Sequence, residues 1–272
     1  MMSPKMNWLP PSFQDLLLEE GTIFEGMNGI KQSATGTGII TLLGSARSGK
    51  TSLAYAMIDT VIRETKRPVS FIGFPDVVMK SMPDHWQNRI YNPQDIEKII
   101  QFNYPSVILL DDTAVTLNSR DAMTKSSKLM SRLAGVISHI GGGLTVILTT
   151  QSMSGVDLSL LRYTQLAVGV RKVSPMTLWS ERSHWLPRIK EAQYEINSHS
   201  KEANCRDLYY SLMDDTLCRS WFPSWLSRDE NLDRADKLSR PFRYMEKGKL
   251  MEILTKPPES KKKRRKKEDG ED

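Results

Sequence analysis

Eight consecutive residues, from Gly44 to Thr51, have the types and spacing needed to hold a chain of phosphates. They read Gly-Ser-Ala-Arg-Ser-Gly-Lys-Thr and fit G-x-x-x-x-G-K-[ST], the Walker A loop of nucleoside triphosphate sites. Gly44 and Gly49 let backbone N–H groups approach an anion and allow a positive φ. Lys50 supplies a mobile ammonium for the β- and γ-phosphates, and the Thr51 hydroxyl suits Mg²⁺. The predicted ATP-binding residues are Gly44, Ser45, Ala46, Arg47, Ser48, Gly49, Lys50, Thr51 and Ser52.

The segments on either side of this loop have the pattern that a phosphate site needs. Residues 38–43 form an apolar run that predicts a buried strand of a parallel sheet, and residues 51–65 carry apolar side chains at helical spacing. A helix that begins at the loop directs its free N–H groups and its dipole at the phosphate. The alternative is a chance match in a turn that binds nothing, and the flanking strand and helix argue against it.

Two neighbouring carboxylates, Asp111 and Asp112, end a third predicted strand that begins at Ser106. Parallel strands end at the edge of the sheet where ligands of open α/β folds bind. We therefore predict that Asp111 holds Mg²⁺, directly or through a ligand of the ion, and that Asp112 is the base that orients the attacking water. The alternative is a strand that ends in a solvated acidic turn.

A fourth predicted strand, residues 144–151, ends in the polar residue Gln151. If this strand lies between the strand before the phosphate loop and the strand that ends in Asp111, Gln151 would reach the γ-phosphate or the water. It would then report hydrolysis to the rest of the subunit. The alternative is an amide that only hydrogen-bonds a loop.

These elements predict an α/β fold of the P-loop NTPase type, with a mostly parallel central sheet covered by helices in three layers. Further strands are expected at residues 68–74 and 166–170, and helices at residues 12–20, before Trp86, from Asn92 onward and at residues 122–140. The expected units are an N-terminal helical strap (1–37), the ATPase core (38–185), a helical C-terminal extension (186–257) and a disordered basic and acidic tail (258–272).

Composition describes a soluble globular protein, with 26% charged and 39% hydrophobic residues in 272. The longest apolar runs fall far short of the ~20 residues that span a bilayer, so no membrane span and no signal peptide are expected. Cys205 and Cys218 are expected to be reduced thiols of a cytoplasmic protein, and the histidines show no zinc-ligand spacing.

The net charge of +6 is partly local, because residues 261–267 are an unbroken basic run followed by four acidic residues. Such a block repels itself and stays solvated. It predicts a tether to the phosphates of nucleic acid or a nuclear-import signal, and the alternative is a solubilising tail.

Taken together, these motifs resemble the FtsK/HerA superfamily of additional-strand P-loop ATPases, and the resemblance implies a RecA-like three-layer sandwich with an additional strand in its central sheet. Within that superfamily the likeness is to genome-packaging ATPases of membrane-containing viruses and their archaeal relatives, and it covers roughly residues 35–185. The residues that carry it are the Walker A loop, Asp111-Asp112, Thr149-Thr150-Gln151-Ser152, Val156-Asp157-Leu158-Ser159-Leu160-Leu161-Arg162, Ser174-Pro175 and Glu181-Arg182.

The resemblance implies a hexameric or similar ring of identical subunits that hydrolyses ATP at subunit boundaries and pumps double-stranded DNA through its centre, into a capsid. It implies a capsid or capsid-vertex protein as a partner, and a location in the host cytoplasm or on the virus particle. The chain departs from the family at Asp112, where Glu is usual, and at Ser138-His139-Ile140, where an arginine is usual. We therefore predict that Arg132 or Arg162, with Arg120 behind them, is the arginine given to a neighbour's site. The alternative for each is a surface arginine.

Two other functions remain open on the sequence. One is a cellular FtsK/HerA-like motor for conjugation or DNA processing. The other is a nucleotide-gated switch with slow turnover, which the shorter Asp112 would suit. A small-molecule kinase is disfavoured, because no arginine-rich lid follows the third strand.

Overall fold

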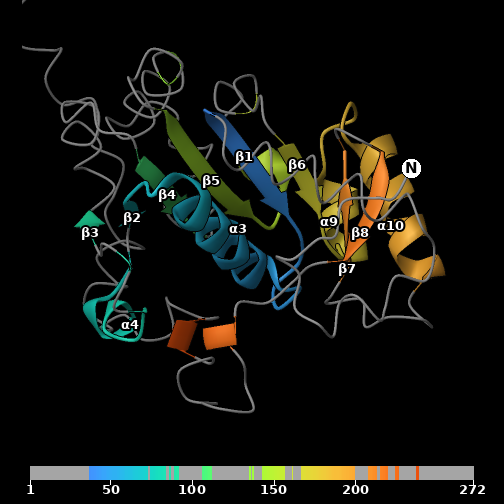
Figure 1. Cartoon of the computed structure of the whole chain (residues 1–272). Helices are drawn as coiled ribbons and strands as arrows, with labels where there is room; N and C mark the ends of the chain where they lie inside the picture. The colour runs from blue at the N-terminus through green and yellow to red at the C-terminus, as the bar shows by residue number, and fades with distance from the viewer. Residues whose placement is uncertain are drawn as a thin grey trace, which may run out of the picture.

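A computed structural model of the chain describes residues 37–72, 74–83, 86, 89–91, 106–111, 135, 137, 143–156, 161, 167–199, 208–212, 215–219, 224–226 and 237–238. Within these residues, eight strands form one sheet in the spatial order β3-β2-β4-β5-β1-β6-β7-β8 (Figure 1). The strands are β1 (Gly38–Leu43), β2 (Val69–Ile72), β3 (Arg89–Tyr91), β4 (Ser106–Leu110), β5 (Leu144–Thr150), β6 (Ala167–Val170), β7 (Leu208–Ser211) and β8 (Thr216–Arg219).

In this spatial order, the first six strands, β3-β2-β4-β5-β1-β6, are parallel to one another. β7 pairs antiparallel with β6, and β8 pairs antiparallel with β7. β5 lies between β4 and β1, with Ile39 opposite Val146 and Leu110 opposite Leu148. The predicted α/β fold with a mostly parallel sheet is therefore confirmed. The strand that ends before Gln151 lies between the two strands of the phosphate site, which is the condition on which the predicted role of Gln151 depends.

Two helices cover opposite faces of the sheet, which gives the predicted three layers (Figure 1). α3 packs against the side chains of Ile40 and Leu42, whereas α10 packs in the core that holds Ile39 and Leu43. Because both faces are covered, β1 is an apolar run rather than an alternating one. The helices and 3₁₀ turns are α3 (Lys50–Thr65), α4 (Asp76–Met79), η4 (Met153–Gly155), α9 (Pro175–Ser180), α10 (Leu186–Ser198) and η5 (Ser224–Leu226).

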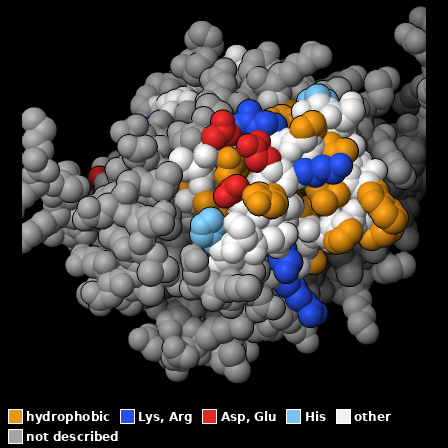
Figure 2. Space-filling model, turned by 90° about the vertical axis from the view of Figure 1, so that its right-hand side faces the viewer, with side chains coloured by type: hydrophobic (Ala, Val, Ile, Leu, Met, Phe, Trp, Pro, Cys, Tyr) orange, Lys and Arg blue, Asp and Glu red, His pale blue; other side chains and the backbone are white. Residues whose placement is uncertain are grey.

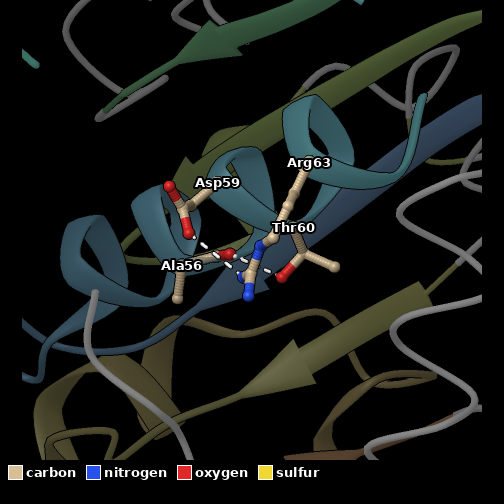
Figure 3. A network of polar contacts seen from close by, with 4 residues as sticks. All are labelled: Ala56, Asp59, Thr60 and Arg63. Atoms are coloured by element: carbon tan, nitrogen blue, oxygen red, sulfur yellow. Dashed lines mark hydrogen bonds and ion pairs between the residues drawn. The ribbon is translucent and has the colours of Figure 1, made fainter. Parts of the chain in front are cut away.

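Two polar side chains in the second half of α3, the helix that follows the phosphate loop, are bonded within the helix itself (Figure 3). The buried Thr60 hydroxyl donates to the Ala56 carbonyl at 3.0 Å, one turn earlier. Arg63 donates to the Asp59 carboxylate at 3.1 Å on the outer side of the helix. An exposed i,i+4 pair of this kind contributes about 0.3–0.5 kcal/mol. The anchorage of α3 therefore comes mainly from its apolar face.

An aromatic cluster beside α3 joins distant parts of the chain. Trp86 stacks on Phe71 with ring centroids 5.9 Å apart and meets Trp225 edge-on at 5.0 Å. Tyr55 of α3 contacts Trp225, and its hydroxyl donates to the Leu238 carbonyl at 2.8 Å. The cluster thus fastens Trp225 and Leu238 beside α3.

The structure corrects several sequence expectations about these elements. The second strand is shorter than residues 68–74, and among the described residues 74–83, before Trp86, the one helix is the short α4. β3 was not predicted, because three residues are too few to show a period. The description of residues 186–257 as helical was incomplete, because β7 and β8 extend the sheet there. Their Tyr- and Thr-containing sequences favour strands, and Asp215 takes the positive φ of 50° that the connecting turn needs.

Several expectations lie outside the described residues. They are the helix at residues 12–20, the helix from Asn92, nearly all of the helix at residues 122–140, and the tail. The domain boundaries stay a prediction. In the described part of the chain, no helix combines the length and the apolar character that crossing a membrane requires.

Candidate nucleotide site

The phosphate loop is held by both strands that flank β1. The Gly44 N–H donates to the Thr150 carbonyl at the end of β5, at 3.1 Å, and the Ser45 N–H donates to the Lys172 carbonyl beyond β6, at 2.9 Å. Gly49 has φ of +89°, and a Cβ there would lie 2.6 Å from Arg171 Nη2. The second glycine of the motif is therefore required both for its backbone conformation and for space.

Lys50 lies along the loop that precedes it. The side chain is buried, and its Nζ donates to the Gly44 carbonyl at 2.8 Å and to the Ser45 carbonyl at 2.9 Å. Backbone carbonyls thus hold the ammonium within the loop that the sequence assigns to phosphate. A cation fixed at this place can neutralise phosphate oxygens with little rearrangement.

Asp111 lies against Thr51, although sixty residues separate them in sequence. The Thr51 hydroxyl donates to the two carboxylate oxygens of Asp111 at 3.0 and 3.2 Å, and the Thr149 hydroxyl donates to Oδ1 at 2.6 Å. Asp111 is only 3% exposed, so these bonds hold its charge in a fixed orientation. A hydroxyl that donates to the carboxylate keeps its lone pairs for a cation. The pair is an oxygen ligand set of the kind that Mg²⁺ prefers, and Thr51 and Asp111 would hold the ion.

The charge of Asp111 also affects the aromatic cluster beneath it. Burial, and to a smaller extent the negative charge of Asp111, raise the pKa of Tyr55 well above its ordinary value. The phenol therefore stays protonated and keeps donating to the Leu238 carbonyl.

Gln151 follows β5 directly and is half-buried. Because β1, β4 and β5 are parallel neighbours, the phosphate loop, Asp111 and Gln151 all lie at one edge of the sheet. The structure thus brings together Lys50, Thr51, Asp111 and Gln151. Asp112, Arg132, Arg162 and Arg120 lie outside the described residues, and their roles stay predictions.

The sequence analysis missed Arg171, which follows β6. Its side chain is 0% exposed, and Nε donates to the Ser48 carbonyl of the phosphate loop at 2.8 Å. Nη1 donates to the Leu208 carbonyl of β7 at 3.1 Å. The guanidinium therefore supports the phosphate loop from behind and links it to the antiparallel part of the sheet. An arginine directly after an apolar strand was the available signal, but only the fold shows which loop it contacts.

The segment that carries Arg171 is itself fixed by α10. Gln193 is a buried amide whose Nε2 donates to the Arg171 carbonyl at 3.0 Å and whose Oε1 accepts from the Val173 N–H at 2.8 Å. One residue further, the Ser174 N–H donates to Ser45 Oγ at 2.6 Å. Residues 171–174 thus connect α10 to the phosphate loop through hydrogen bonds at both sides.

Comparison with known proteins agrees with this site. Residues 40–171 match the family model described as "ATPase family associated with various cellular activities (AAA)". This segment contains the phosphate loop, Asp111 and Gln151. The fold, the site and this match define a P-loop ATPase, an enzyme that hydrolyses ATP to ADP and phosphate. A search of curated protein sequences finds no match.

Solved structures with a similar arrangement include ATPases from viruses and bacteria. The genome packaging NTPase B204 from Sulfolobus turreted icosahedral virus 2, in complex with AMP, has 15% identity and a TM-score of 0.45 over 69% of this chain and 98% of that chain. EssC (ATPases 2 and 3) from Geobacillus thermodenitrificans has 14% identity and a TM-score of 0.49 over 79% of this chain and 44% of that chain. The pCW3 conjugation coupling protein TcpA has 8% identity and a TM-score of 0.47 over 75% of this chain and 65% of that chain.

Proposed function

We propose that this ATPase is a motor that moves double-stranded DNA, and specifically a genome-packaging ATPase of the FtsK/HerA type that fills a viral capsid. The observation that carries the proposal is the position of β5. This strand lies between β4 and β1 and delivers Gln151 to the edge where Lys50, Thr51 and Asp111 meet. A polar group at that place can register whether the γ-phosphate is present, which a motor needs in order to couple hydrolysis to movement.

Each residue has a distinct part in the proposed reaction. The loop N–H groups and Lys50 hold the phosphates, and Thr51 and Asp111 hold Mg²⁺, which would neutralise charge on the β- and γ-phosphates. Asp112 orients the attacking water, and Gln151 contacts the water or the γ-phosphate. Arg132 or Arg162 of a neighbouring subunit stabilises the charge that develops during phosphoryl transfer.

Positive charge supports the proposed DNA partner. The chain carries a net charge of +6, and residues 261–267 are all basic. A run of lysines and arginines binds phosphate backbones without sequence preference, and this is the contact that a motor on arbitrary DNA requires. The FtsK/HerA resemblance of the Thr149–Ser152 strand end supports the same assignment.

Exposed apolar side chains beside the site support assembly into a ring of copies. On α9, Met176 is 68% exposed and Trp179 is 82% exposed. The N-terminal end of α9 is bonded to the phosphate loop through Ser174 and Ser45. Figure 2 shows the side of the molecule that carries α9 and α10, where hydrophobic side chains lie exposed among acidic and basic ones. In the proposed particle this ring works in the host cytoplasm and docks on a capsid protein.

The test is steady-state ATP turnover with and without linear double-stranded DNA, together with sedimentation in the presence of ATP. A packaging motor, or a cellular DNA motor of the same type, is stimulated by DNA and assembles into a multimer. A nucleotide-gated switch turns over slowly and ignores DNA. Turnover that DNA leaves unchanged, in a protein that stays a monomer, refutes the motor.

A further inference from the structure

The turn that follows Gln151 is a compact unit with its own hydrogen bonds. The Ser152 side chain accepts from the Ser154 N–H at 3.2 Å and caps the one-turn helix η4. The Thr150 hydroxyl donates to the Ser152 carbonyl at 2.8 Å. Met153, within η4, is fully buried. The position of this turn therefore determines where the chain leaves Gln151.

Two adjacent residues of opposite charge hold this turn from outside. Glu181 is buried, and its Oε1 accepts from the Met153 N–H at 2.9 Å. Arg182 Nη2 donates to the Ser154 carbonyl at 3.3 Å and to the Val156 carbonyl at 2.9 Å. A helix leaves N–H groups free at its start and carbonyls free at its end. The carboxylate binds the first kind of group and the guanidinium binds the second, so the turn is fixed at both ends.

Stability alone does not explain this pair. Among the described residues, Glu181 Oε2 and Arg182 Nη1 are buried without a hydrogen-bond partner. A buried polar atom without a partner typically costs about 1–3 kcal/mol, and charged groups cost more. The pair nevertheless gives the turn directional hydrogen bonds to its N–H and carbonyl groups, which an apolar contact cannot supply.

The same residues connect the turn to the phosphate loop. Glu181 and Arg182 follow α9, and α9 begins after Ser174, whose N–H donates to Ser45 Oγ at 2.6 Å. Ser174 also caps α9, since its side chain accepts from the Thr177 N–H. α9 is about 9 Å long at 1.5 Å per residue. This short rod has one end bonded to the phosphate loop and the other end bonded to the turn after Gln151.

We propose that Glu181 and Arg182 are positioning residues for ATP hydrolysis, which set the location of Gln151 relative to the phosphate loop through the turn at residues 152–156. The inference rests on the proposed role of Gln151. Neither residue touches the phosphate loop in the described contacts, so the pair affects the hydrolytic step and leaves the binding of ATP unchanged. They act through Gln151, and this distinguishes them from residues that merely stabilise the fold.

The test is a double-mutant cycle on basal ATP turnover, measured without DNA. Glu181→Ala and Arg182→Ala should each lower kcat at least about tenfold and leave KM and ATP affinity within about twofold. In a Gln151→Ala background, either substitution should lower kcat no further, because the group that they position is already gone. Glu181→Gln keeps the oxygen that accepts from Met153, and it should keep kcat within about threefold of the unchanged protein.

The matched control is Arg188→Ala. Arg188 also holds a turn by a backbone carbonyl, since Nη2 donates to Leu212 O at 2.8 Å, but that turn joins β7 to β8. Its loss should leave kcat unchanged. If Glu181→Ala does not fold, Arg182→Ala provides the same cycle with Gln151.

Three results would overturn the proposal. One is independent losses in kcat that multiply in the double variants, and another is equal losses in the Arg188 control. The third is full turnover by Gln151→Ala, which would leave nothing to position. Because the cycle uses basal turnover, DNA stimulation can fail, and with it the motor function, while the cycle still gives its answer.

Discussion

Replacement of Arg171 tests whether the phosphate loop is supported from behind. The guanidinium donates to the carbonyl of Ser48 at 2.8 Å. In a trans peptide the N–H points away from the C=O of the same unit, so this bond directs the Gly49 N–H away from Arg171. In a phosphate loop that is the side of the anion. We therefore expect Arg171 to set the direction of one phosphate-binding N–H group.

The size of the effect is worked from two hydrogen bonds that Arg171 donates to backbone carbonyls of described residues, those of Ser48 and Leu208. Each hydrogen bond from a charged donor contributes about 1.5–3 kcal/mol. Arg171→Met loses both hydrogen bonds. It also removes a buried charge, and the methionine side chain fills part of the space that the arginine occupied, so part of the loss is offset. We therefore expect the free energy of unfolding to fall by about 2–4 kcal/mol. One misdirected N–H to a charged phosphate weakens ATP binding by a similar amount per bond, about 10- to 150-fold.

The assay combines urea unfolding with ATP affinity from titration calorimetry, at a temperature where each variant is folded. Arg171→Lys keeps the charge, but its single ammonium cannot reproduce the planar fork, so it should fall between the parent and Arg171→Met. Arg188→Met is the control, because Arg188 bonds the β7–β8 turn instead of the loop. If both Arg171 variants are folded and bind ATP as tightly as the parent, the reasoning about the Ser48–Gly49 peptide is wrong.

The remaining predictions concern the reaction and the tail. Lys50→Ala should abolish ATP binding or turnover, because it removes the ammonium held at the Gly44 and Ser45 carbonyls. Filter binding measures the first and phosphate release the second, and normal turnover would contradict the proposed nucleotide site. Asp112→Asn should still bind ATP but stop hydrolysis in single-turnover measurements, and retained turnover would exclude Asp112 as the base. Removal of residues 261–267 should weaken DNA binding mainly at low salt, and an unchanged slope of log affinity against log salt would show that the tail does not touch phosphate.

Local sequence predicted that Thr51 and Asp111 lie at the same edge of the sheet, and their hydrogen bond shows that they do. The spacing of Gly44, Gly49 and Lys50 specifies a backbone conformation, and the apolar run before Asp111 specifies a buried strand whose end must reach the same edge. Both signals are contained in fewer than ten residues. The place of β5 between β4 and β1 was only a condition for the predicted role of Gln151, and the structure meets that condition.

The supporting residues could not be predicted, because their partners are distant in sequence. Arg171 contacts Ser48 across 123 positions, and Gln193 contacts Val173 across twenty. Nothing in the pattern around either residue states which loop it will meet. β7 and β8 were missed for a related reason, because short strands of four residues gain their identity from the neighbour that they pair with.

In the proposed ring, these contacts also bear on which step a neighbouring subunit would complete. The phosphate loop is bonded to the ends of β5 and β6 by protein groups alone, through the Gly44 and Ser45 N–H groups, and Arg171 supports it from behind. A loop that is already ordered loses little conformational entropy when ATP binds, so one subunit can hold ATP by itself. In the proposed mechanism, phosphoryl transfer needs in addition an arginine from a neighbouring subunit, which a separated subunit lacks. Separated subunits should therefore bind ATP with nearly the affinity of the assembly and hydrolyse it far more slowly. Equal turnover per subunit at concentrations above and below the assembly midpoint would contradict this division of labour.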